Sequence, residues 1–112
     1  MSVKRWTALV LSAVWMMLAA PAWAETPEFV LTIKDHKFEP AEFEVPANVK
    51  VKLIVKNLDP TPEEFESYEL NREKVIAGGR EAVIFIGPLE PGTYPYFGEF
   101  NADTAQGKII AK

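Results

Sequence analysis

The residues best able to do chemistry in this chain are oxygen ligands that gather in two short stretches. Three glutamates follow Pro62 closely, and a second polar and acidic stretch begins at Glu99. Carboxylate oxygens are hard ligands that suit ferrous or ferric iron and manganese, and they also accept cupric copper. A metal site and a solvated acidic rim are both compatible with this pattern. The candidate metal ligands are Glu63, Glu64, Glu66, Glu99, Asn101, Asp103 and His36.

Strand alternation divides the first acidic stretch. Successive side chains of a β-strand point to opposite faces, so an inward-facing Phe65 places Glu63 on the same inner face. Glu64 and Glu66 then share the opposite face. Glu63 is therefore the better single candidate for a ligand.

Soft ligands and catalytic motifs are missing from the pattern. The chain has no Cys, and its Met residues all fall within residues 1–24. His36 is the single His, and it is compatible with a ligand or with a partly exposed structural residue, because a lone His lacks the clustering of metal motifs. No nucleophile and base pair, phosphate loop or paired acid motif is visible, so no residues support a hydrolase or a transferase.

The first 24 residues are typical of an export signal. A basic start precedes an apolar run over residues 7–20, which is short for a bilayer span. The small residues Ala22 and Ala24 then form a pattern that signal peptidase accepts. We expect cleavage after Ala24, which leaves one domain over residues 25–112. An uncleaved N-terminal anchor is the less favoured alternative, because the apolar run is short.

The charge balance is acidic. The chain has 16 Asp and Glu against 12 Lys and Arg, a formal net charge of −4. Such a surface disfavours nucleic acid and anionic lipid, and it favours cations or a basic partner.

The positioning elements are predicted to be short strands. Apolar and β-branched runs recur about every ten residues with turn residues between them, which is typical of an all-β sandwich or barrel. Nine prolines favour turns over helices. The predicted strands cover residues 29–33, 43–45, 49–55, 65–68, 82–86, 93–97 and 107–111.

Nearly all of residues 29–112 resembles cupredoxin domains. Residues 33–40 and 44–53 resemble the first hairpin of that family, and residues 91–110 resemble its ligand loop. The resemblance implies a Greek-key β-sandwich of about seven or eight strands.

The same resemblance implies that the copper ligands are lost. Glu63 stands where the first His would be, and Asn101 stands where the second would be. Gly98 or Glu99 takes the Cys position, and Thr104 or Ala105 takes the Met position. A blue-copper centre needs the soft thiolate, so no type 1 copper centre is expected.

A narrower resemblance concerns function. Residues 61–67, 72–74, 87–89 and 98–107 are similar to a subgroup of small periplasmic cupredoxin-like proteins that accompany bacterial high-affinity iron permeases. It implies a periplasmic accessory role in ferrous iron uptake, with iron or copper bound through carboxylates. The implied partners are a periplasmic iron-binding protein and the inner-membrane iron permease complex. A metal-free interaction module that docks on these partners is the alternative, and a ferroxidase is a further one.

Overall fold

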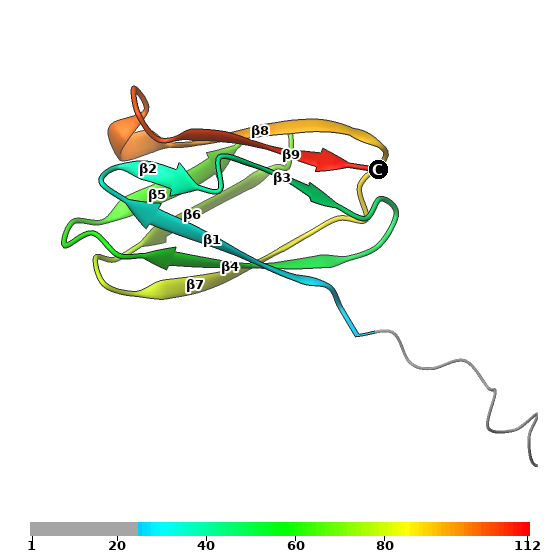
Figure 1. Ribbon diagram of the computed structural model, residues 1–112, viewed down its shortest axis with the longest axis horizontal. Helices are drawn as coiled ribbons and strands as arrows, with labels where there is room; N and C mark the ends of the chain where they lie inside the picture. Colours follow the sequence, from blue (N-terminus) through cyan, green and yellow to red (C-terminus); the bar gives the residue numbers. More distant parts are fainter. Residues whose placement is uncertain (1–24) are drawn as a thin grey trace, which may run out of the picture.

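The protein is a sandwich of two β-sheets. The computed structural model describes residues 25–112, and the predicted signal peptide, residues 1–24, lies outside the described residues. The strand orders are β2-β1-β4-β7 and β3-β9-β8-β5-β6, and Figure 1 shows them as two layers. The elements are β1 (Glu28–Lys34), β2 (Lys37–Glu39), β3 (Glu42–Val45), β4 (Val51–Asn57), β5 (Glu63–Ser67), β6 (Arg72–Ile76), β7 (Glu81–Ile86), β8 (Gly92–Gly98), the 3₁₀ helix η1 (Glu99–Asn101) and β9 (Gln106–Ala111).

Each sheet contains one parallel pair. β1 runs parallel to β4, and β3 runs parallel to β9, while the other neighbours are antiparallel. A parallel neighbour cannot be reached by a tight hairpin, so the chain crosses between the layers. The crossing brings β5 and β8 side by side although they are far apart in the sequence.

The space between the sheets holds an aromatic centre. The Phe65 ring stacks on Tyr96 with centroids 5.1 Å apart, and Phe38 meets Tyr96 edge-on at 5.0 Å. Burial raises the pKa of the Tyr96 hydroxyl, which donates a hydrogen bond to the Pro40 carbonyl at 3.3 Å. These rings fix the inner face of β5 and β8 and therefore the direction of every side chain on those strands.

The all-β prediction is confirmed, and the seven predicted strands are present with shifted ends. Two further strands, β2 and β6, bring the number in the described part of the chain to nine. Of the five residues of β6, only Ile76 is buried. An edge strand of this kind has no apolar alternation, so the sequence pattern carries no signal for it. No helix within residues 25–112 is long and apolar enough to cross a membrane.

The loop before β5 is held by one amide side chain. Asn57 is buried and donates from Nδ2 to the carbonyls of Thr61 (2.8 Å) and Ile76 (3.1 Å). Its Oδ1 accepts the Asp59 N–H at 3.0 Å. At the same end of the sandwich, the Gly98 N–H donates to the Ala105 carbonyl at 2.8 Å and closes the loop that contains η1. These bonds position the acidic residues of both stretches.

Candidate metal centre

Strand β5 carries acidic side chains on both of its faces. Glu63 is 1% exposed and points inward with Phe65, while Glu64 and Glu66 lie on the outer face. This is the alternation expected from the sequence. The two faces give these carboxylates different surroundings.

The inner carboxylate is completely engaged in hydrogen bonds. Glu63 Oε1 accepts the backbone N–H groups of Phe100 (2.9 Å) and Glu64 (3.0 Å). Its Oε2 accepts the Asn101 side-chain amide at 2.7 Å. Glu63 and Asn101, the residues that the family resemblance aligns with the two His ligands, thus bind one another. They pin the loop after β8 to the start of β5.

Gly98 and Ala105, two of the residues that the family resemblance aligns with the other copper ligands, are small and close this end. Gly98 is buried, and a Cβ built on it would lie 2.6 Å from Glu63 Cδ and 2.7 Å from the Ala105 Cβ. Ala105 is 0% exposed. Of the two residues that the family resemblance aligns with the Cys ligand, Gly98 is the one that faces Glu63, and the carboxylate takes up the space that a larger side chain would need.

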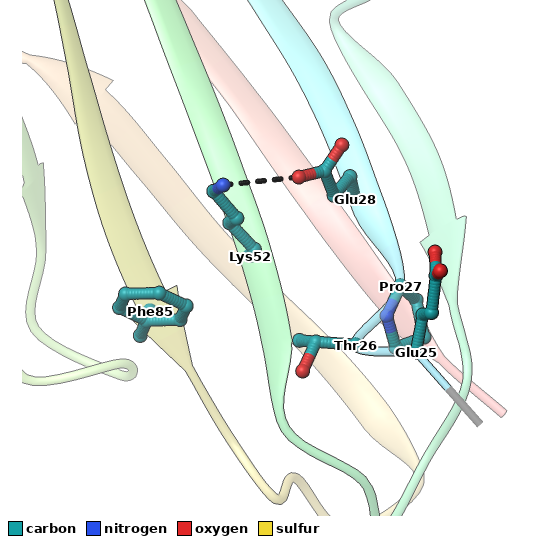
Figure 2. Close-up of a pocket in the computed structure, with 6 residues that line it drawn as sticks. All are labelled: Glu25, Thr26, Pro27, Glu28, Lys52 and Phe85. Atoms are coloured by element: carbon teal, nitrogen blue, oxygen red, sulfur yellow. Dashed lines mark ion pairs between the residues drawn. The ribbon is translucent and has the colours of Figure 1, made fainter. Parts of the chain in front are cut away.

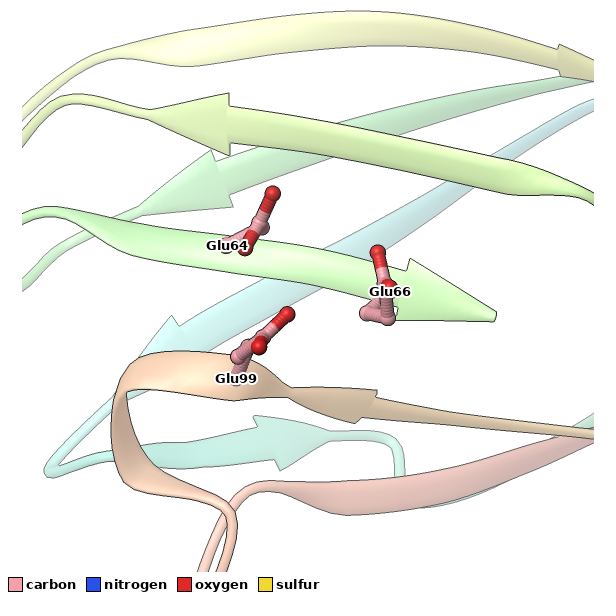
Figure 3. A group of neighbouring side chains, drawn as sticks. All are labelled: Glu64, Glu66 and Glu99. Carbon is pink, nitrogen blue, oxygen red and sulfur yellow. The ribbon is translucent and has the colours of Figure 1, made fainter. Parts of the chain in front are cut away.

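Three carboxylates converge on the outer face. Glu64, Glu66 and Glu99 each offer an oxygen within 4.8 Å of the other two, and Figure 3 shows them gathered over β5 and the start of η1. Such an arrangement of hard oxygen donors can hold a hard cation. It lies on the other face of β5 from Glu63.

One oxygen of this outer group has no partner. Glu66 is 7% exposed, and its Oε2 is buried without a hydrogen bond. A desolvated carboxylate without a donor is costly, and like charges beside it add to the cost. Desolvation, followed by neighbouring Glu73, raises the pKa of Glu66. Desolvation, followed by a hydrogen bond with Glu99, raises the pKa of Glu64.

The other two candidate ligands lie outside both groups. Asp103 is exposed in the turn after η1, and within residues 25–112 it is not part of the converging set. His36 lies in the β1–β2 turn, with its Nδ1 3.6 Å from Asp59 Oδ2. The Asp59 carboxylate also accepts hydrogen bonds from the N–H groups of Asp35 (2.8 Å) and His36 (3.0 Å). Asp59 and His36 therefore stabilise the β1–β2 turn.

A separate groove lies near the start of β1, at the opposite end of the sandwich from η1. It has a volume of 570 Å³ and is bordered by Thr26, Pro27 and the Phe85 ring (Figure 2). The Lys52 ammonium crosses it to pair with Glu28 at 3.0 Å. Lys52 and Glu28 are paired with each other and, of the residues that the structure describes, Glu25 is the only other acidic one that lines the groove, so it offers no convergent set of free carboxylates.

The topology and the site together define a class of protein. The two parallel pairs, the aromatic centre and the ligand end filled by Glu63 describe a cupredoxin-type sandwich without a thiolate. The model of the cupredoxin-like domain family matches residues 7–111, and the chain belongs to that family.

A sequence relative covers most of the chain. The chain is 52% identical over 83 residues to the uncharacterized protein RP394 of Rickettsia prowazekii (strain Madrid E), which covers 74% of this chain and 66% of that protein. The chain thus spans just under two thirds of the length of this relative.

Three solved structures share the fold. Auracyanin A, a blue copper protein of Chloroflexus aurantiacus, has a TM-score of 0.67 and 12% identity, over 79% of this chain and 100% of that chain. The metal binding domain of the Streptococcus pneumoniae D39 Cu(I) exporting P-type ATPase CopA has a TM-score of 0.69 and 16% identity, over 81% and 92%. Amicyanin of Paracoccus versutus has a TM-score of 0.60 and 20% identity, over 84% and 88%. At these identities the likeness concerns the fold alone.

Proposed function

We propose that this protein is a periplasmic accessory protein of iron uptake that binds an iron or cupric ion through Glu64, Glu66 and Glu99. The observation that carries the proposal is the buried, unpartnered Oε2 of Glu66 within this group of three carboxylates. A bound cation would supply the missing partner and offset the mutual repulsion of the three charges.

The donor set restricts the chemistry of the ion. All three donors are carboxylates, and the chain has no Cys. Hard oxygen donors favour iron, manganese or cupric ions over cuprous copper, which prefers sulfur. The ion would be cargo that is bound on the outer face of a sheet. A partner protein could reach it there directly.

The proposed partners are a periplasmic iron-binding protein and an inner-membrane iron permease complex. The resemblance of residues 61–67 and 98–107 to permease-associated proteins supports this choice. The acidic balance of the chain supports it as well, since it favours cations and basic surfaces.

A metal-free interaction module is the second candidate. It is favoured by an apolar row on the outer face of the other sheet, where Val30, Ile54 and Val83 are in register across three strands. Val30 and Val83 are exposed. Exposed apolar side chains in a continuous row can mark a protein contact.

Calorimetric titration of the processed protein, made without a polyhistidine tag, tests the metal proposal. Anaerobic ferrous ion, ferric citrate and cupric ion are titrated into the wild type and into Glu66→Gln. We expect saturable binding that weakens by about tenfold or more in Glu66→Gln, because one charged ligand is lost.

The matched control is Glu81→Gln, an exposed glutamate on the other sheet that should bind as the wild type does. Absence of saturable binding with all three ions would overturn the metal proposal and leave the interaction module.

A further inference from the structure

A second recess opens next to the outer carboxylate group. It has a volume of 380 Å³ and lies where the β5–β6 hairpin turns. Glu66 is shared, because it belongs both to the three converging carboxylates and to the wall of this recess. The residues around it are Glu66, Ser67, Tyr68, Asn71, Arg72 and Glu73.

Two carboxylates form the acidic side of the recess. Glu66 on β5 and Glu73 on β6 are directly opposite in the antiparallel register, so their side chains point to the same face. Like charges in this arrangement repel each other, and a cation between them would relieve the repulsion. Glu66 Oε2 is buried with no hydrogen-bond partner.

The residues that the structure describes do not supply that cation. Within residues 25–112, no Lys, Arg or His nitrogen forms an ion pair with Glu66 or Glu73. Arg72 borders the recess, but its Nε donates to the Phe85 carbonyl at 2.8 Å and its Nη1 to the Asn71 carbonyl at 2.9 Å. Its guanidinium group is thus directed to backbone carbonyls.

An exposed aromatic ring forms another side of the recess. Tyr68 is 74% exposed although it is a large side chain. Its ring rests on Phe97 with centroids 5.7 Å apart, and Phe97 is in register with Glu66 across β5 and β8. A supported, solvent-facing ring beside two carboxylates can bind a planar cation through its face and its charge together.

We propose that this recess receives an arginine side chain of a partner protein. A guanidinium group fits better than an ammonium group because it can pair with carboxylates through two N–H groups and stack on a tyrosine ring. The partner is therefore one that presents an exposed arginine at its docking surface.

Because Glu66 belongs to both sites, arginine binding in the recess is coupled to metal binding. The coupling rests on the proposed function, since it requires an ion at Glu64, Glu66 and Glu99. An arginine that engages Glu66 withdraws one of three ligands, so arginine and metal weaken each other's binding by the same factor. A carrier that meets its partner in this way releases its ion at the point of contact.

The docking half is tested by nuclear magnetic resonance titration of the ¹⁵N-labelled, processed and metal-free protein. The probe is N-acetyl-arginine amide, and the control probe is N-acetyl-citrulline amide, which has a similar shape without the charge. We expect saturable shifts of the Tyr68, Asn71 and Glu73 amide signals in the millimolar range with arginine only.

Three variants set the specificity of this result. Glu73→Gln should weaken arginine binding by about tenfold, and Tyr68→Leu by about threefold. Both residues are exposed, so the fold is expected to be retained. Glu81→Gln should bind as the wild type does. Equal binding of the citrulline probe, or unchanged binding by Glu73→Gln, would overturn the arginine site.

The coupling half uses the calorimetric metal titration with and without saturating N-acetyl-arginine amide. A fall in metal affinity with the arginine probe, and none with the citrulline probe, is the expected result. A metal affinity that is unchanged by the bound arginine probe would overturn the proposal that arginine and metal share Glu66. If no metal binds at all, the proposed function fails, while the resonance titration still decides whether the recess takes arginine.

Discussion

Glu63 and Glu66 lie three positions apart on one strand and show two opposite ways of placing a carboxylate. Glu63 faces the interior, and its two oxygens accept three hydrogen bonds from Glu64, Phe100 and Asn101. Glu66 faces the outer side among other glutamates, and its Oε2 has no donor. The more deeply buried carboxylate is thus the one with a complete set of partners.

The difference separates a structural role from a binding role. A buried acceptor that is satisfied by its own fold stabilises that fold and has no free capacity for a ligand. An acceptor without a partner is a cost to the isolated protein that a ligand can remove. Glu63 therefore acts within the fold, and the outer face of β5 is where the proposed binding site lies.

The largest expected effect comes from Glu63→Ala, which tests the structural half of the comparison. Removal of the carboxylate leaves two backbone N–H groups and the Asn101 amide without acceptors. We expect the free energy of unfolding to fall by about 3 kcal/mol or more. Urea denaturation followed by far-ultraviolet circular dichroism measures it. Glu63→Gln keeps one oxygen for the N–H groups and should lose only about 1 kcal/mol. Equal stability of both variants and the wild type would contradict the structural role.

A slightly smaller effect is expected for Gly98→Ala. The added methyl group would lie 2.6 Å from Glu63 Cδ, so the carboxylate or the backbone must shift. Overpacking of this kind lowers the free energy of unfolding by about 2 kcal/mol. The midpoint of thermal unfolding shows the change, and Gly79→Ala cannot serve as a matched control because its φ is +71°. Gly92→Ala, whose added Cβ would meet no atom closer than 3.8 Å, is the suitable one.

Asp59 is a second carboxylate, besides Glu63, whose oxygens accept hydrogen bonds from the protein's own backbone. Hydrogen bonds, first from the His36 N–H and then from the Asp35 N–H, outweigh burial and lower the pKa of Asp59 below the ordinary value of 3.8. A lowered pKa means that the stabilisation is present above 3.8 and is lost as the pH falls through the folded-state pKa. Asp59→Asn should cost about 1–2 kcal/mol at neutral pH. Its unfolding midpoint should also lack the acid-linked loss of the wild type below 3.8. A parallel pH dependence of both proteins would contradict the assignment.

The smallest change in the free energy of unfolding is expected for Glu66→Gln without metal. This change should be an increase, whereas the other substitutions lower the free energy of unfolding. Desolvation and Glu73 raise the pKa of Glu66 above 4.5, so its ionised form destabilises the folded state at neutral pH. The variant should therefore unfold at a higher urea concentration than the wild type in the presence of a chelator. The wild type regains stability relative to the variant as the pH falls through the raised pKa toward 4.5, so the difference between the two proteins should narrow as the pH is lowered. A variant less stable than the wild type at neutral pH would show that Glu66 is structural as well.

Much of this arrangement could be predicted from the sequence. The all-β class followed from apolar runs and turns, and the opposite orientations of Glu63 and Glu66 followed from a period of two around Phe65. The converging position of Glu99 required the family resemblance, because its neighbours Glu64 and Glu66 are far from it in the sequence.

The hydrogen-bond partners could not be predicted in the same way. Glu63 and the Phe100 N–H that it accepts are 37 residues apart and meet only because β5 and β8 pair. Strand alternation alone favoured Glu63 as the metal ligand. The pattern contains no information about hydrogen-bond donors that come from a distant loop. The recess at Tyr68 and Glu73 could not be predicted from the sequence either, because β6 lacks the alternation of apolar residues that identifies a strand.

The bond from Arg72 Nε to the Phe85 carbonyl has a consequence for self-association. β6 and β7 are the outermost strands of their sheets, and this side chain joins them across the open side of the sandwich. A free strand edge is a template on which another chain can add a strand and begin to polymerise. By occupying one of the carbonyls of β7, Arg72 is expected to hinder the addition of a further strand at this edge.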